Sequence, residues 1–147
     1  VDNGAFKMNP PIRSEADRLA LIEGVLDGTI DLIATDHAPH SKEEKEKGLK
    51  NSLFGIVGLE TAFPAMYTHF VKTNKMSMER LLDLMVYNAE KIFGISPKGY
   101  SVWNLEESFI VNPEEFLTKG RYTPFKDKEL FGVNYLTVYN GKTVYKK

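Results

Sequence analysis

The side chains best suited to catalysis or metal binding lie together in the segment ATDHAPH, at positions 34–40. One carboxylate and two imidazoles, Asp36, His37 and His40, fall within this segment, although the chain contains only three histidines. A carboxylate among imidazoles can bind a metal ion through oxygen or move protons, and this combination is typical of metal-dependent hydrolases. The alternative is structural: Asp36 caps a turn, His37 packs against apolar neighbours and His40 lies in solvent. The spacing alone leaves both interpretations open.

The elements predicted before this segment place it at the end of a strand. Ser14 is a typical helix-capping residue, apolar residues recur at helical spacing after it, and Gly28 is a natural stop. We therefore expect a helix over residues 15–27. The apolar run IDLI then predicts a short buried strand over residues 30–35. Active sites of parallel α/β folds lie at the carboxyl ends of strands, so Asp36 occupies a position typical of catalytic residues.

Residues 5–9 and 41–52 lie close in sequence to the candidate site residues. Residues 5–9 predict a short strand, because the prolines at positions 10 and 11 cannot continue a sheet ladder. Residues 41–52 carry seven charges among twelve residues, which favours a solvated loop. A functional lid over the site is the alternative for this segment.

The middle of the chain is predicted to be helical. Apolar spacing indicates a helix over about residues 59–72, with Pro64 in its first turn, where a missing N–H does no harm. A second helix is expected to begin after the capping residue Ser77, and a short third helix to run from Asn88 to Gly94.

The last third of the chain is predicted to form strands. Beyond Pro97, three runs rich in β-branched and aromatic residues alternate in polarity, and the pair Asn140-Gly141 predicts a tight hairpin turn. We therefore expect an α/β region over residues 1–97 and a small β unit over residues 98–147. Such a small sheet buries little surface alone, so it is expected to be completed by strands from elsewhere.

The composition excludes several classes of function. The chain has 147 residues, with 19 basic and 20 acidic side chains and a net charge of -1, which provides no electrostatic footprint for nucleic acid or an anionic membrane. It has no cysteine, and therefore no disulfide, thiolate metal site or thiol nucleophile. No segment resembles a signal peptide or a membrane span, so we expect a cytoplasmic protein.

Three runs of sequence carry a family resemblance: FKMNPPIR, IDLIATDHAPH and FGIVGLET, at residues 6–13, 30–40 and 54–61. In this order they resemble the dihydroorotases of the amidohydrolase superfamily, specifically the bacterial type with a D-H-A-P-H motif. The run from Glu106 to Gly132 is similar to the tail of the same family. Related hydantoinases and allantoinases carry D-H with a different tail, and they are the alternative among enzymes.

The resemblance implies a fold and a reaction. The fold is the C-terminal fragment of a TIM (β/α)8 barrel, followed by a β-sheet extension that forms part of a composite β-sandwich. The reaction is the metal-dependent, reversible interconversion of N-carbamoyl-L-aspartate and L-dihydroorotate, a step of pyrimidine biosynthesis.

The resemblance also implies roles for five residues. Asp36 is a zinc ligand and the catalytic proton shuttle, which takes the proton of the metal-bridging hydroxide and passes it to the leaving nitrogen. Asn9 and His40 bind the substrate carboxylate. Phe54 and Gly55 provide a main-chain contact to the ring amide, where glycine allows a close approach.

The family's other metal ligands have no counterpart in this chain. The family uses an H-x-H pair, two further histidines and a carbamylated lysine or an aspartate, whereas this chain has three histidines in total. We therefore expect one or two zinc ions to be held mainly by the remainder of the same polypeptide, and the chain alone to be inactive. The expected assembly is a homodimer, with aspartate transcarbamoylase as a further candidate partner. A non-catalytic assembly subunit is the alternative to an enzyme.

Overall fold

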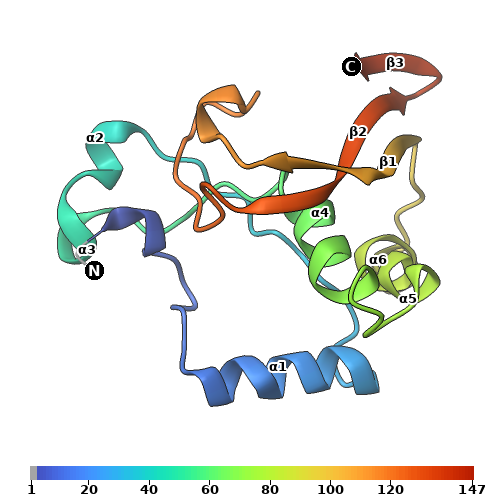
Figure 1. The fold of residues 1–147 in the computed structure, drawn as a ribbon, viewed down its shortest axis with the longest axis horizontal. Helices are drawn as coiled ribbons and strands as arrows, with labels where there is room; N and C mark the ends of the chain where they lie inside the picture. Colours follow the sequence, from blue (N-terminus) through green and yellow to red (C-terminus); the bar gives the residue numbers. More distant parts are fainter. Residues whose placement is uncertain (1–2) are drawn as a thin grey trace. The chain divides into compact units, whose positions relative to one another are not determined.

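The computed structural model describes residues 3–147 and combines helices with one three-stranded sheet (Figure 1). Its residues group into two compact units that are interleaved along the chain. The first unit contains the residues up to Ile22 together with Thr35–Ala62 and Ile110–Lys128, and the second contains Glu23–Ala34, Phe63–Phe109 and Glu129–Lys147. All five residues with a predicted role lie in the first unit.

The helix predicted over residues 15–27 is confirmed as α1, Glu15–Asp27. Its start is fixed by a reciprocal cap, in which the Asp17 main-chain N–H donates to Ser14 Oγ at 3.3 Å and the Ser14 N–H donates to the Asp17 carboxylate at 3.1 Å. The helix ends before Gly28, whose φ of +93° lies in the region that glycine adopts at low cost.

The first unit consists of short helices and extended segments. Main-chain hydrogen bonds join the extended segments, because Ala38 N donates to Ile56 O at 2.9 Å and Val57 N donates to Tyr122 O at 3.0 Å. Three stretches that are distant in sequence therefore lie side by side. The short helices are η1 (Gly4–Phe6), α2 (Lys42–Lys45), α3 (Gly48–Asn51) and η4 (Pro113–Glu115).

Two long helices, each with a π-helical turn, supply most of the helical structure of the second unit. The first runs from α4 (Ala62–Met66) into η2 (Tyr67–Val71), and the second runs through α5 (Met78–Leu82), η3 (Asp83–Tyr87) and α6 (Asn88–Phe93). The cap by Ser77 is confirmed, since its Oγ accepts from Arg80 N at 3.2 Å. The predicted bounds of the third helix are confirmed by α6, which ends before Gly94 (φ +65°), although α6 follows η3 without interruption. Nowhere in residues 3–147 is a helix both long and apolar enough to cross a membrane.

The sheet is formed by β1 (Gly99–Ile110), β2 (Glu129–Tyr139) and β3 (Lys142–Lys146), in that order. The predicted hairpin is confirmed: β2 and β3 pair antiparallel, and Asn140 and Gly141 between them have φ values of 48° and 73°. Two of the predicted strand runs are joined in the single strand β1. The predicted boundary between residues 97 and 98 stays a prediction.

The core of the second unit contains side chains from both its helices and its sheet. Leu81, Leu84 and Leu130 are completely buried. Phe63 lies beside Trp103 of β1, with ring centroids 4.6 Å apart. These apolar contacts hold the sheet against the helix that begins with α4.

Two predicted strands are absent from the structure. Residues 30–35 form no strand, and their main chain is tied instead to the helix at residue 84, where Ile33 N donates to Leu84 O at 2.8 Å. A strand needs a neighbouring strand for its ladder, and none lies beside this segment in the described part of the chain. Residues 5–9 begin instead in the 3-10 turn η1, because the Asn3 side chain accepts from Ala5 N at 2.8 Å and caps that turn.

The solvated loop predicted for residues 41–52 is also wrong, because the segment folds into α2 and α3. Ser41 and Glu44 form a capping box at the start of α2: Glu44 N donates to Ser41 Oγ at 3.3 Å, and Ser41 N donates to Glu44 Oε2 at 2.9 Å. One of the seven charged side chains, Lys45, is buried. The segment is therefore a folded part of the first unit.

Candidate functional site

Three of the predicted site residues, His40, Phe54 and Gly55, lie in direct contact. His40 Nε2 lies 2.8 Å from the carbonyl oxygen of Phe54. Gly55 N donates to the carbonyl oxygen of Lys7 at 3.0 Å, which brings the main chain two residues before Asn9 against the same segment. The first unit therefore gathers the segments that carry four of the five residues.

The His40 ring is held by contacts at both nitrogens. Nε2 faces the Phe54 carbonyl, which can only accept, so Nε2 carries a hydrogen. Nδ1 lies 3.3 Å from the Glu44 carboxylate on α2. Because Glu44 is fixed by the capping box, the folding of α2 sets the orientation of the imidazole.

Gly55 lies where a side chain has no room. Its φ is +132°, and a Cβ built on it would lie 2.7 Å from Ala38 O and 2.9 Å from His40 Nε2. Both distances are shorter than real Cβ contacts, so any other residue would displace Ala38 or His40. The ATDHAPH segment approaches this glycine closely, and the predicted contact of Gly55 with the substrate stays a prediction.

Asp36 is exposed and has a φ of +44°, in the left-handed region that aspartate tolerates better than most residues. No hydrogen bond or ion pair of its carboxylate is found within residues 3–147. The Asp36 carboxylate therefore has no partner among the described residues. A carboxylate in this state can accept a proton or bind a cation.

Asn9 is also exposed, and it precedes a cis peptide bond to Pro10. The structure does not bring its side chain into contact with His40. Asn9 and His40 are connected through the main chain, by the bond between Gly55 N and Lys7 O.

His37 makes structural hydrogen bonds. The main-chain N–H groups of Gly58 and Leu59 point at His37 Nδ1, at 3.1 Å and 3.2 Å. Nδ1 is therefore an acceptor, and the hydrogen of the neutral ring lies on Nε2. This arrangement ties the ATDHAPH segment to the residues just before α4.

Lys45 is the site-forming residue that sequence reasoning missed. Its ammonium group donates to three carbonyl oxygens, of Lys7 at 3.1 Å, Leu53 at 2.9 Å and Gly55 at 2.7 Å. Burial, followed by the nearby charge of Lys7, lowers the pKa of Lys45 below its usual value. The S-x-x-E pattern at residues 41–44 is a signal for the capping box and the helix, but nothing local indicates that this lysine faces inward.

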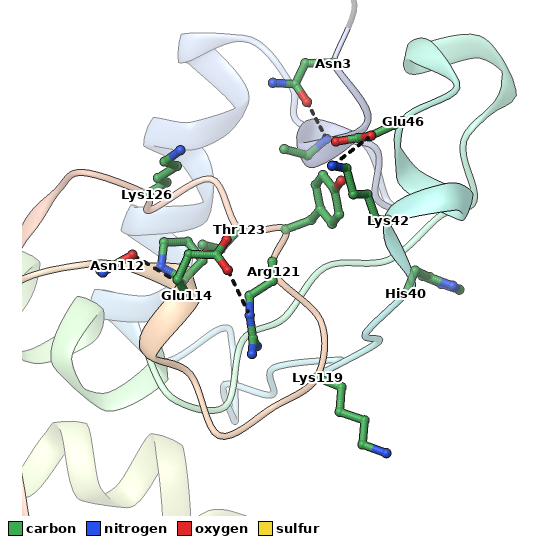
Figure 2. A pocket seen from close by; sticks show the side chains of 13 residues that line it. Asn3, His40, Lys42, Glu46, Asn112, Glu114, Lys119, Arg121, Thr123 and Lys126 are labelled. Atoms are coloured by element: carbon green, nitrogen blue, oxygen red, sulfur yellow. Dashed lines mark hydrogen bonds and ion pairs between the residues drawn. The ribbon is translucent and has the colours of Figure 1, made fainter.

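A cavity of about 480 Å³ in the first unit has His40 at its rim. Figure 2 shows Lys42 beside Glu46 and Arg121 beside Glu114 in its lining, with ion pairs of 3.8 Å and 3.6 Å. Lys119 and Lys126 also line the cavity, so its lining carries more positive than negative charge. The His40 side chain points away from this group.

The described residues do not form a complete metal site. Within residues 3–147 no group of three or more histidine, cysteine, aspartate or glutamate side chains is placed to hold a metal ion. Zinc in catalytic sites normally takes three protein ligands. The donor set of the described residues therefore does not fit a self-contained zinc site, and Asp36 could provide at most one ligand of a larger set.

Comparisons with known proteins identify the relatives of the chain. No family model matches the sequence. The chain is 52% identical to a dihydroorotase of Fusobacterium nucleatum and 49% identical to a dihydroorotase of Lactobacillus leichmannii, over 153 aligned residues in each case. The chain is homologous to the dihydroorotases. The alignments cover 98% and 99% of the chain but 36% of each relative, so the chain spans about a third of their length.

Hydantoinases are among the solved structures that this chain resembles. An L-hydantoinase from Arthrobacter aurescens matches with a TM-score of 0.87 at 32% identity, covering 96% of this chain and 34% of the hydantoinase. A D-hydantoinase from a Bacillus species, AR9, matches with a TM-score of 0.89 over 97% of this chain and 34% of its own. At 18% identity, the second match concerns the fold alone.

Proposed function

We propose that this chain is the C-terminal part of a zinc-dependent dihydroorotase, which interconverts N-carbamoyl-L-aspartate and L-dihydroorotate. The observation that carries the proposal is the identity of about half of all aligned residues with two dihydroorotases, which extends over nearly the whole chain. The contact of His40 with Phe54, inside a fold shared with a hydantoinase, supports it.

In the complete protein, the chain forms the last elements of a TIM barrel and part of a β-sandwich. The segment 30–35, which has no strand beside it in the described residues, would gain its ladder from barrel strands of the preceding polypeptide. The exposed apolar side chains of α1 support the proposal that further polypeptide packs on this helix, since Leu19 and Leu21 expose 53% and 59% of their surface.

Each site residue then has one task. Asp36 accepts a proton when water attacks the ring carbonyl and returns it to the departing ring nitrogen. His40 and Asn9 donate hydrogen bonds to the substrate carboxylate, and the Phe54–Gly55 main chain binds the ring amide. For His40 to donate to the substrate, the ring amide N–H takes the place of His40 Nε2–H on the Phe54 carbonyl, and the released Nε2–H turns to the substrate carboxylate.

Zinc would be held mainly by residues outside this chain. When it is bound, the metal supplies Lewis acidity toward the scissile carbonyl. Because the described residues do not complete a metal site, we further propose that the 147-residue chain is inactive by itself.

The proposal is tested by substrate comparison. We expect the full-length polypeptide to turn over dihydroorotate with a kcat/KM at least about 100-fold above that for hydantoin or allantoin, because a site built for a carboxylate loses its hydrogen bonds with neutral rings. The 32% identity to an L-hydantoinase makes that enzyme class the second candidate, and a preference for hydantoin would establish it. A folded protein that turns over none of the three substrates would indicate a non-catalytic assembly subunit.

Cellular location and partners follow from the proposed activity. We propose a cytoplasmic enzyme that forms a homodimer, with aspartate transcarbamoylase as a candidate partner. Sedimentation of the full-length protein with and without aspartate transcarbamoylase tests both assemblies.

A further inference from the structure

Lys45 is a buried cation of the first unit. Only 1% of its surface is exposed, and its ammonium group donates to the carbonyl oxygens of Lys7, Leu53 and Gly55. An ammonium group has three hydrogens, so all of its donors are used. No ion pair of Lys45 is found within the described residues.

The three acceptors belong to two segments that are far apart in sequence. Lys7 lies two residues before Asn9, and Leu53 and Gly55 flank Phe54. The Lys7 carbonyl oxygen also accepts from Gly55 N at 3.0 Å, so the ammonium group and this hydrogen bond hold the same two segments together. The ammonium group thus fixes the main chain on both sides of the predicted substrate contacts.

The main chain of Lys45 is held independently of its ammonium group. The Lys45 carbonyl oxygen accepts from Ser52 Oγ at 2.7 Å, and Leu53 N donates to Glu44 O at 3.1 Å. Glu44 is in turn fixed by its capping box with Ser41. Loss of the charge alone is therefore expected to leave α2 in place, with Leu53 N still bound to it, and to loosen the Lys7 and Gly55 carbonyl groups.

We infer that Lys45 is a positioning residue for substrate binding: its three hydrogen bonds hold the Asn9 and Phe54–Gly55 segments, and through Phe54 the His40 ring, in the geometry that recognises the carboxylated ring. The inference rests on the proposed function. Lys45 itself does not touch the substrate. Its effect is exerted through the main-chain carbonyls that it binds.

The test compares Lys45→Met with Lys47→Met in the full-length polypeptide. Methionine has a similar length and no donors, and Lys47 is exposed and makes no side-chain cap bond at the start of α3. We expect Lys45→Met to raise the KM for dihydroorotate about tenfold or more, because small misplacements of binding groups are costly. Lys47→Met is expected to change KM less than about twofold.

The readout separates positioning from folding, because KM does not depend on the concentration of active enzyme whereas the apparent kcat does. An unchanged KM with a reduced apparent kcat would show that Lys45 serves folding alone and would overturn the inference. If Lys45→Met yields no active protein, Lys45→Gln is measured instead, because glutamine keeps two donors on a shorter side chain. The same comparison of KM values then applies. Absence of activity in both variants would also overturn the inference. A parent enzyme without dihydroorotase turnover would instead refute the proposed function.

Discussion

His40 Nε2 lies 2.8 Å from the carbonyl oxygen of Phe54, so the imidazole and the main chain predicted to bind the ring amide form one hydrogen-bonded unit. On the other side of the ring, Nδ1 faces Glu44 at 3.3 Å. The orientation of His40 is therefore set by the fold of the first unit before any ligand is present. This relationship makes the properties of the site sensitive to residues that do not touch the substrate.

Replacement of His40 by alanine is expected to weaken binding of the carboxylated substrate. A hydrogen bond to a charged group contributes about 1.5–3 kcal/mol, so the KM for dihydroorotate should rise by roughly 10-fold to 100-fold in His40→Ala. Steady-state kinetics of the full-length enzyme measure this. His69→Ala is the control, because His69 is exposed on the helix of the second unit. Equal KM values for the two variants would contradict the role of His40.

Glu44 should contribute a pH-dependent part of the stability. The main-chain N–H of Ser41 lowers the pKa of Glu44 below 4.5, and the His40 ring lowers it further. Because the pKa is lower in the folded state, the contribution is complete above about pH 4.5 and is lost as the pH falls through the folded value. The difference in unfolding midpoint between the parent and Glu44→Gln should therefore shrink with acidification.

Ser41→Ala provides the control for this prediction. It removes the Oγ that accepts from Glu44 N but keeps the main-chain N–H that lowers the pKa of Glu44. We expect a loss of about 1 kcal/mol in the free energy of unfolding from the lost cap. The Ser41 hydroxyl also lowers the pKa of Glu43 and Glu44, so only part of this loss should disappear with acidification. Denaturant titrations across the acidic range measure both variants. A difference for Glu44→Gln that stays constant with pH would show that the carboxylate makes no such contribution.

Alanine at Gly55 should damage both stability and substrate binding. The added Cβ would lie 2.7 Å from Ala38 O and 2.9 Å from His40 Nε2, and φ is +132°, so we expect a loss of about 2–3 kcal/mol and a raised KM. Gly94→Ala separates strain from crowding, because Gly94 has a φ of +65° but no atom within 4 Å of its added Cβ. It should lose about 1 kcal/mol and keep the parent KM. A Gly55→Ala enzyme with the parent KM would show that His40 tolerates displacement.

The 147-residue chain by itself should bind zinc weakly and turn over no dihydroorotate. Within the described residues, no three donor side chains converge on one point, and a lone carboxylate binds zinc poorly. Calorimetric titration of zinc into the chain, beside a titration of the metal-depleted full-length enzyme, measures the difference. Comparable affinities in the two proteins would mean that the metal ligands lie within this chain.

Local signals in the sequence predict the elements whose stability is local. Ser14 and Asp17 form the expected cap of α1, and the Asn140-Gly141 pair forms the expected hairpin turn, because both features depend on neighbouring residues only. The resemblance likewise selects His40, Phe54 and Gly55, which the structure brings into contact. The roles of these residues stay predictions.

Features that depend on residues distant in sequence cannot be predicted from local sequence patterns. The run at residues 30–35 has the apolar pattern of a buried strand, but a strand forms only beside another strand. The charge density of residues 41–52 suggests solvent, whereas Lys45 is buried because carbonyl oxygens of Lys7, Leu53 and Gly55 surround its ammonium group. Neither fact can be derived from the local sequence.

Turnover by Asp36→Asn in the full-length, zinc-loaded enzyme tests whether Asp36 moves the proton during hydrolysis. The comparison is Asp127→Asn, since Asp127 is another exposed aspartate with a positive φ, of 63°. We predict that Asp36→Asn lowers kcat by about 100-fold to 10,000-fold while the thermal unfolding midpoint stays close to that of Asp127→Asn. An Asp36→Asn enzyme with the kcat of the parent would contradict the assignment.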